Sequence, residues 1–326
     1  MKIVQADRLD SLADYRLTEV DTPAPGPGEV RIRVAACGVG YVDALVALGR
    51  YQVKPPLPHV PGNEVAGWVE AVGEGVAGLA EGDRVMAMAR GGGFAEMTLA
   101  PAVVTTPIPD AMSFEQAAGF RINYLTALHG LRDRAVLQPG ERLLVTGAAG
   151  GVGMAAVQVG AVMGAAVIAV ASSDDKRAFA LANGAALALD TEPEGWRDRL
   201  KALTDSKGAD VVFDPVCGRL FEAAFRSLSW RGRHLVVGFA GGPIPALPAN
   251  LPLMKGAALV GVDVRQFMLF EGRRAQAHLT ELLGWVADGR LSPPVGRGFA
   301  LDQFGEALEF ALTGQGLGKT VLTVAG

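Results

Sequence analysis

The feature that most constrains this chain is a glycine-rich turn between an apolar strand and an apolar helix. Residues 143–147 read Leu-Leu-Val-Thr-Gly, as in a buried strand, and residues 154–159 begin a helix. Glycines at such a turn let the backbone approach a pyrophosphate, and the free N–H groups of the helix N-terminus attract the anion. The sequence therefore predicts a dinucleotide-binding turn, made of Ala149, Gly150, Gly151, Val152 and Gly153.

The end of the next strand indicates which dinucleotide is bound. NAD sites place an acid about 20 residues further on, where it holds the ribose 2′-hydroxyl. Here the strand ends in Ser172 and Ser173, and Lys176 follows one turn later. These side chains leave room for a 2′-phosphate and can donate to it, so we expect NADPH. The alternative is that Ser173 only caps the next helix, and that Asp174 or Asp175 holds the ribose of NAD.

The pattern of elements predicts an α/β chain of two domains, a number that suits 326 residues. Residues 1–124 read as short strands between Pro- and Gly-rich loops, which is typical of a barrel-like β domain. Residues 125–263 alternate apolar strands with helices, which predicts a doubly wound parallel sheet. Residues 264–326 hold two helices, at 275–288 and 301–313, and a terminal strand. We expect this last segment to pack on the first domain.

Composition excludes several classes of partner. The net charge of −4 and the pI near 5.7 give no basic field for nucleic acid. No apolar stretch reaches the length of a membrane span, and the N-terminus shows no targeting segment. The two cysteines, Cys37 and Cys217, lie far apart and suit a reducing cytoplasm. A small-molecule substrate is the remaining expectation.

At this point the chain resembles the zinc-free NADPH:quinone oxidoreductase (zeta-crystallin-like) branch of the medium-chain dehydrogenase/reductases. The matching segments are residues 35–43, 51–58, 61–67, 126–129, 148–153, 214–218, 237–239 and 317–319. The resemblance implies a GroES-like catalytic domain from residues 1–124 and 264–326, a Rossmann domain at 125–263, and a catalytic cleft where the two meet. It also implies a homodimer or homotetramer, for which residues 257–262 are the natural pairing edge. Burial of that segment within one subunit is the alternative.

Two positions predict that no metal takes part. Zinc-dependent members have a cysteine after the Gly-Val pair and a histidine before the glutamate of the later motif, because Zn²⁺ prefers thiolate and imidazole ligands. This sequence has Gly40 and Asn63 there, and Cys37 comes three residues early. The family usually has Asn where Gly40 stands, a residue that contacts the nicotinamide ribose or the substrate, so the resemblance does not carry that contact over to this chain.

Without a metal, the acceptor must already be electron-poor, and a quinone fits best. Tyr41, Tyr51 and Tyr124 are the candidate proton donors, because Tyr41 and Tyr51 fall in the matching segments and Tyr124 lies two residues before one of them. Each could instead form an apolar wall. An enone or enoyl-CoA reductase is the first alternative, with residues 50–54 and the arginines 265, 273 and 274 as groups for coenzyme A phosphates. A non-catalytic NADPH-binding redox sensor or scaffold is the second.

The resemblance also assigns residues to the rest of the cofactor. Val216 and Gly238 are supported independently, because they follow the carboxyl ends of predicted parallel strands, where such sheets bind ligands. The cofactor set carried over by resemblance is Thr126, His129, Val216, Gly238, Phe239, Ala240, Val262, Val264, Gly318 and Lys319.

Overall fold

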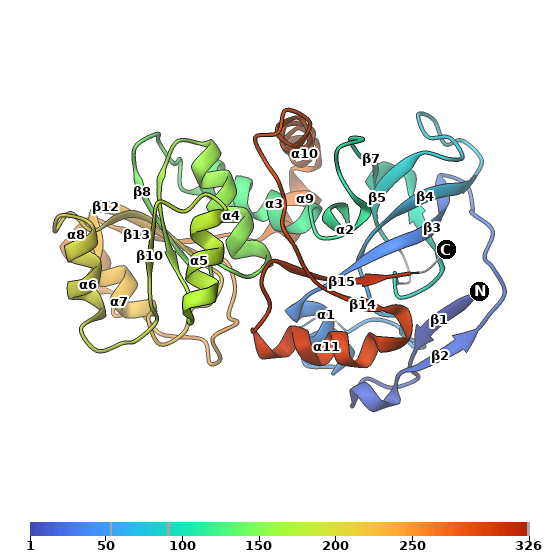
Figure 1. The fold of residues 1–326 in the computed structure, drawn as a ribbon, viewed down its shortest axis with the longest axis horizontal. Helices are drawn as coiled ribbons and strands as arrows, with labels where there is room; N and C mark the ends of the chain where they lie inside the picture. Colours follow the sequence, from blue (N-terminus) through green and yellow to red (C-terminus); the bar gives the residue numbers. More distant parts are fainter. Residues whose placement is uncertain (53, 90–91, 325–326) are drawn as a thin grey trace. The chain divides into compact units, whose positions relative to one another are not determined.

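The protein is described by a computed structural model that covers residues 1–52, 54–89 and 92–324. It divides into two compact units (Figure 1). The first consists of Met1–Arg121 and Pro293–Gly326, and the second of Ile122–Ser292. The sequence predicts boundaries at 124/125 and 263/264, so residues 264–292 belong to a different unit from the one expected. Val53, in the loop considered for coenzyme A, lies outside the described residues.

The first unit is built on a seven-stranded sheet with the order β14-β15-β3-β4-β5-β7, in which β6 also pairs with β3. All of its pairs are antiparallel except β14 with β15. Strands β1 and β2 form a separate antiparallel pair. This is the β-rich domain that the sequence predicts, formed by both parts of the chain. The strands are β1 Lys2–Gln5, β2 Arg16–Glu19, β3 Glu29–Val39, β4 Glu64–Val72, β5 Arg84–Met88, β6 Met97–Pro101, β7 Thr105–Pro107, β14 Val295–Ala300 and β15 Lys319–Thr323.

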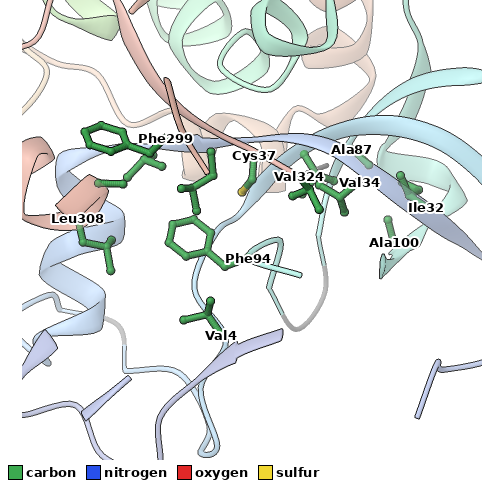
Figure 2. Close-up of a cluster of buried hydrophobic side chains, with 14 of the residues drawn as sticks. Val4, Ile32, Val34, Cys37, Ala87, Phe94, Ala100, Phe299, Leu308 and Val324 are labelled. Carbon is green, nitrogen blue, oxygen red and sulfur yellow. The ribbon is translucent and has the colours of Figure 1, made fainter. Parts of the chain in front are cut away.

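Alternation along β3 decides which of its faces is buried. Val30, Ile32 and Val34 are buried, whereas the intervening Arg31 and Arg33 are partly exposed. Figure 2 shows the cluster that these valines and Ile32 join, with side chains contributed by strands from both ends of the chain. A substantial part of the first unit's stability comes from this burial, at roughly 25 cal/mol per Å² of apolar surface.

Three helices accompany this sheet: α1 Tyr41–Ala47, α2 Phe114–Ala117 and α11 Phe304–Thr313. Helix α2 begins with a capping box, a pattern of Ser and Gln three residues apart that the sequence itself contains. The Ser113 hydroxyl accepts from the Gln116 amide at 3.2 Å, and the Gln116 side chain accepts from the Ser113 amide at 3.0 Å. Helix α11 contributes Leu308 to the buried cluster (Figure 2).

The second unit contains a six-stranded sheet with the order β10-β9-β8-β11-β12-β13, and every pair is parallel. The order runs outward from β8 in both directions, which confirms the doubly wound prediction. The strands are β8 Arg142–Thr146, β9 Ala166–Val170, β10 Leu187–Leu189, β11 Ala209–Asp214, β12 Leu228–Val236 and β13 Ala258–Gly261. The helices are α3 Arg121–Leu128, whose first residue falls in the first unit, α4 Gly151–Val162, α5 Asp174–Ala182, α6 Trp196–Leu203, α7 Phe221–Arg226, α8 Asn250–Lys255, α9 Val264–Phe270 and α10 Gly272–Ala287.

Helix α10 belongs to the second unit for a physical reason that the sequence does not reveal. A π-helix, His129–Arg134, continues from α3 and contains Asp133. The Asp133 carboxylate lies 2.9 Å from Nε2 of His278 on α10 and 2.5 Å from the Arg274 guanidinium. Arg132 forms a bidentate ion pair with Glu281, which is also on α10. From the sequence we expect residues 275–288 to belong with the first domain, whereas the structure groups α10 with the second unit. In the described part of the chain, no helix is both long and apolar enough to cross a membrane.

Candidate active site

The predicted dinucleotide turn lies between β8 and α4. Gly150 is the N-cap of α4, and its φ of −85° and ψ of 173° are extended. A Cβ atom on Gly153 would lie 2.2 Å from the Gly147 carbonyl oxygen, so the helix can approach the strand only with glycine there. A Cβ atom on Gly150 would meet nothing closer than 3.5 Å. Space therefore remains open in front of the helix N-terminus, where an anion would bind.

The neighbouring strands bring their carboxyl ends to the same edge of the sheet. A Cβ atom on Gly147 would lie 2.9 Å from Val216 Cγ2, so the loop after β11 lies directly beside the turn. A Cβ atom on Gly238 would lie 3.1 Å from the Pro215 carbonyl oxygen, and the Ala240 amide donates to that oxygen. The side chain of Phe239 is 41% exposed. The structure thus brings together the glycine turn and the predicted residues 216 and 238–240, all within the second unit.

A buried carboxylate holds this edge in place. Asp214, the last residue of β11, accepts from the amides of Val216 at 3.0 Å and Cys217 at 2.8 Å. The Thr146 hydroxyl at the end of β8 also donates to it, and His234 Nε2 on β12 lies 3.0 Å away. Burial alone would raise the pKa of Asp214, but the hydrogen bonds from His234 and Thr146 outweigh it and lower that pKa. One side chain therefore connects three strand ends.

The residues predicted at the 2′-phosphate lie at the end of β9. The Ser173 hydroxyl accepts from the Lys176 amide at 3.3 Å and so caps α5, as the alternative interpretation required. Lys176 Nζ donates to the Ser172 hydroxyl at 3.3 Å, which places the ammonium and that hydroxyl together. Asp174 is occupied with Arg177. Desolvation lowers the pKa of Lys176. The Ser172 hydroxyl and the Lys176 ammonium therefore lie side by side after the end of β9.

Thr126, His129 and Tyr124 lie on α3 or in the π-helix, and all three are buried. The Thr126 hydroxyl donates to the Ile122 carbonyl at 2.6 Å. His129 Nδ1 lies 2.8 Å from Asp133, and its ring stacks on Phe267 of α9 with centroids 3.9 Å apart. His129 thus has partners within the protein that the sequence does not suggest.

Tyr124 is one of the three candidate proton donors. Its hydroxyl donates to Gln158 Oε1 on α4 at 2.6 Å. Burial raises the pKa of Tyr124, because the phenolate would be poorly solvated. The hydroxyl is therefore held as a neutral donor inside the second unit.

Val262 and Val264 stand on either side of Asp263, which caps α9. The Val262 amide donates to the Val236 carbonyl at 3.0 Å, extending the pairing of β13 with β12. Val264 is the first residue of α9. Both lie beyond the carboxyl end of β13, at the same edge of the sheet as the glycine turn.

In the first unit, a polar corner surrounds the start of α1. Asp43 is buried, and its Oδ2 accepts from the Gly40 amide at 2.8 Å, which caps the helix. Its Oδ1 accepts from the Asn63 amide group at 3.1 Å. Burial raises the pKa of Asp43, against the lowering effect of the Lys319 charge and of the Gly40 hydrogen bond. Asp43 therefore caps the helix through the Gly40 amide and also connects it to Asn63.

The donors at this corner do not fit a zinc ion. Gly40 offers no side chain, and the Asn63 amide is bound to Asp43. Cys37 is fully buried on β3, and burial raises the pKa of its thiol well above the usual value, which disfavours the thiolate that zinc needs. Within residues 1–52, 54–89 and 92–324, no three His, Cys, Asp or Glu side chains are grouped to hold a metal ion.

The remaining predicted residues also belong to the first unit. Tyr41 is the first residue of α1 and is 37% exposed, and Tyr51 is half-buried in the loop that follows that helix. Gly318 has a φ of +69°, and a Cβ there would lie 2.8 Å from the Pro294 carbonyl oxygen. Lys319 begins β15, and its side chain runs toward Gly40.

The long-range partners of two carboxylates at these sites are not predicted from sequence. Asp214 stands out there only as part of a motif, and its signal is a charged residue ending an apolar strand just before a proline. The pairing of Asp43 with Asn63 joins residues 20 positions apart, and no local pattern indicates it.

Comparison with known proteins agrees with this architecture. Residues 26–110 match the family model described as the alcohol dehydrogenase GroES-like domain, and residues 151–281 match the model described as zinc-binding dehydrogenase. The quinone oxidoreductase-like protein 2 homolog of Nematostella vectensis is 38% identical over 91% of this chain and 82% of that protein.

Solved structures are similar over nearly the whole chain. The quinone oxidoreductase of Thermus thermophilus, solved also in complex with NADPH, has a TM-score of 0.85 and 33% identity, covering 99% of this chain and 100% of that one. The CurK enoyl reductase has a TM-score of 0.89 and 25% identity, covering 99% of both chains. The chain therefore belongs to the medium-chain dehydrogenase/reductase superfamily, in its quinone oxidoreductase branch.

Proposed function

We propose that this chain is an NADPH-dependent reductase that transfers hydride to a quinone without a metal ion. The observation that carries the proposal is the β8–α4 turn, where Gly153 permits close packing against Gly147 and Gly150 leaves space before the helix N-terminus. That geometry suits a pyrophosphate. The Thermus thermophilus relative, solved in complex with NADPH, supports the same cofactor.

The residues of the second unit would hold the cofactor as follows. The amides of residues 149–153 bind the pyrophosphate, and Ser172, Ser173 and Lys176 bind the 2′-phosphate. Val216 and residues 238–240 contact the nicotinamide end, on a loop positioned by Asp214. The bound cofactor supplies the hydride. Residues 126, 129, 262 and 264 complete this set as predictions.

The donor chemistry at the corner of Gly40 and Asn63, which lacks a thiolate and an imidazole, supports metal independence. An acceptor that is already electron-poor needs no Lewis acid, and this favours a quinone. Tyr41 and Tyr51 have accessible side chains and are the proposed proton donors, with Tyr124 as the third candidate. Each of the three tyrosines is replaced by Phe, and kcat is measured with one quinone to identify the proton donor. The catalytic tyrosine is the one whose loss lowers kcat by about 100-fold, because general acid catalysis contributes roughly 10²–10⁴-fold.

An enone or enoyl-thioester reductase is the second candidate, supported by the structural similarity to the CurK enoyl reductase. The deciding experiment follows the loss of NADPH absorbance with a quinone panel, an enone panel, and acrylyl and crotonyl thioesters. Turnover fastest with quinones supports the proposal, and turnover confined to thioesters replaces it with the second candidate. NADPH binding without turnover in any panel would support a redox sensor or scaffold instead.

We also propose that two copies of the chain pair along β13. This strand is at the end of the six-stranded sheet, and Ala258, Leu259 and Gly261 are exposed. Unpaired strand edges with apolar side chains associate readily. The reducing environment of the cytoplasm is the proposed location of the protein, because Cys37 and Cys217 are buried free thiols.

A further inference from the structure

The Lys319 side chain lies along a path that three glycines keep open. A Cβ atom on Gly119 would lie 2.3 Å from Lys319 Cγ, and one on Gly38 would lie 2.9 Å from Lys319 Cε. At the far end of the path, a Cβ on Gly40 would lie 3.0 Å from Lys319 Nζ. Any side chain at Gly38 or Gly119 would therefore block the lysine stem.

The backbone at both ends of this path is fixed. Strand β15 pairs with β3 in a register that sets Thr320 opposite Val39, so Lys319 enters the sheet beside the end of β3. A Cβ at Gly38 would also lie 2.2 Å from the Ala118 carbonyl oxygen, which brings the chain after α2 against the same strand. The flexible lysine stem is thus confined to one direction, and its ammonium is delivered to the corner of Gly40 and Asp43.

The Asp43 carboxylate helps to hold the Lys319 ammonium in place. Both Asp43 oxygens are used, Oδ2 by the Gly40 amide and Oδ1 by Asn63, so the carboxylate is held in one orientation. The Asp43 carboxylate and the Lys319 ammonium attract each other, and the Lys319 charge lowers the pKa of Asp43. Within the described residues, no carboxylate forms an ion pair with Lys319 Nζ. The ammonium could therefore donate to a ligand without breaking an ion pair.

We propose that Lys319 Nζ binds the carbonyl oxygen of the acceptor and stabilises the oxyanion that forms there, with Asp43 as the positioning residue for this corner. The acceptor class is then a conjugated carbonyl compound, either a quinone or an enone. This inference rests on the proposed function and names the substrate chemistry of the first unit. It assigns Lys319 to the acceptor, whereas the family resemblance assigns it to the cofactor.

Reduction of the conjugated carbonyl compound is a two-electron hydride transfer. One hydride forms a new C–H bond at the β-carbon, the electron pair of the C=C bond moves toward the carbonyl, and the C=O π pair becomes the oxyanion. The cofactor is oxidised by two electrons. Lys319 donates a hydrogen bond to the oxyanion, and a proton from the proposed tyrosine donor, which water then reprotonates, completes the reduction. A donor that is already in position needs no reorganisation, and removing one such donor typically lowers kcat by about 10²–10³-fold.

A nitrophenol tests the inference without NADPH or turnover. Its anion resembles the oxyanion and is coloured, so its pKa can be measured when it is bound. We expect the wild-type protein to lower that pKa by at least about one unit, which corresponds to roughly tenfold tighter binding of the anion than of the neutral phenol. Lys319→Met removes the shift, and Lys2→Met, the same change at an exposed position of the first unit, retains it.

A second variant controls for misfolding of Lys319→Met. Gly40→Ala places a Cβ 3.0 Å from Lys319 Nζ and 3.3 Å from Asp43 Oδ2, both side-chain ends, so we expect the protein to fold while the ammonium and its positioning carboxylate shift. We expect the nitrophenol shift to shrink in Gly40→Ala and to be partly restored in Lys319→Arg. Thermal unfolding checks that the variants remain folded.

The results that would contradict the role of Lys319 differ from those that would contradict the proposed function. A wild-type protein without preference for the anion, or a Lys319→Met variant that keeps the shift, overturns the inference. A Lys319→Met variant that loses affinity for NADPH but keeps the nitrophenol pKa shift also overturns the inference, because Lys319 would then bind the cofactor. Absence of NADPH binding by the wild-type protein contradicts the proposed function alone, since the nitrophenol titration does not use NADPH.

Discussion

His234 Nε2 lies 3.0 Å from Asp214 Oδ2 in the interior of the second unit, with both side chains almost completely removed from solvent. Their strands, β12 and β11, are neighbours in the parallel sheet. Because Asp214 also accepts from the Val216 and Cys217 amides, this pair fixes the loop that lies beside the glycine turn. A contact within the core thus determines the shape of the proposed cofactor site.

Removal of the Asp214 charge should destabilise the protein and loosen that loop. Asp214→Asn is expected to lower the free energy of unfolding by about 3 kcal/mol, because it leaves buried partners without a carboxylate. Urea unfolding measures the loss. Asp21→Asn, at an exposed position, is the control and should change stability by less than about 0.5 kcal/mol. Equal effects of the two substitutions would contradict the role given to Asp214.

The two glycines of the turn should separate folding from cofactor binding. Gly153→Ala forces a Cβ to within 2.2 Å of the Gly147 oxygen and should cost about 1–3 kcal/mol of stability. Gly150→Ala meets no such obstacle and should fold normally, yet bind NADPH more weakly because its methyl group fills the open space. Thermal unfolding and NADPH fluorescence titration measure the two effects. Normal NADPH affinity in Gly150→Ala would show that the pyrophosphate binds elsewhere.

Lys176 should decide the preference for the phosphorylated cofactor. Lys176→Met removes the ammonium beside Ser172 and is expected to lower kcat/KM for NADPH by about tenfold, the usual value of a charged hydrogen bond. The value for NADH should not change. Lys201→Met, at an exposed lysine on α6, is the matched control. A parallel decrease with both cofactors would exclude a contact to the 2′-phosphate.

The proposed dimer depends on the exposed edge of β13. Leu259 is 44% exposed there, and Leu259→Lys introduces a charge that an intersubunit strand pair would have to bury. We expect the wild-type protein to sediment as a dimer and the variant as a monomer. Val103→Lys, at an exposed valine of the first unit, should leave the sedimentation unchanged. A wild-type monomer at micromolar concentration would rule the pairing out.

His59 should make stability dependent on pH. Its Nδ1 lies 2.7 Å from the Tyr15 hydroxyl, and burial lowers its pKa from 6.5 to about 4. Between these values the unfolded chain binds a proton that the folded protein does not. The free energy of unfolding therefore falls as the pH falls from about 6.5 to about 4.

His59→Asn tests this directly, because asparagine does not titrate in that range. The variant should show a flatter dependence of unfolding free energy on pH, measured by urea unfolding at several pH values between those limits. An unchanged slope would mean that another group is responsible.

The sequence by itself indicated the type of each unit, although not which unit contains residues 264–292. Strand period, glycines and caps are local signals, so the β8–α4 turn, the parallel sheet and the Ser113–Gln116 capping box could all be predicted from neighbouring residues. The missing zinc ligands at Gly40 and Asn63 could also be recognised, because they are a matter of side-chain identity.

Tertiary structure decided what pairs across long separations in the chain. Asp133 holds α10 to the second unit through His278, 145 residues away, and no periodic pattern encodes such a contact. The same is true of Asp214 with Thr146, and of Lys319, whose path exists only because Gly38, Gly40 and Gly119 are brought to one place. A buried charge is stable only beside a partner, and which partner it meets is set by the packing of the whole unit.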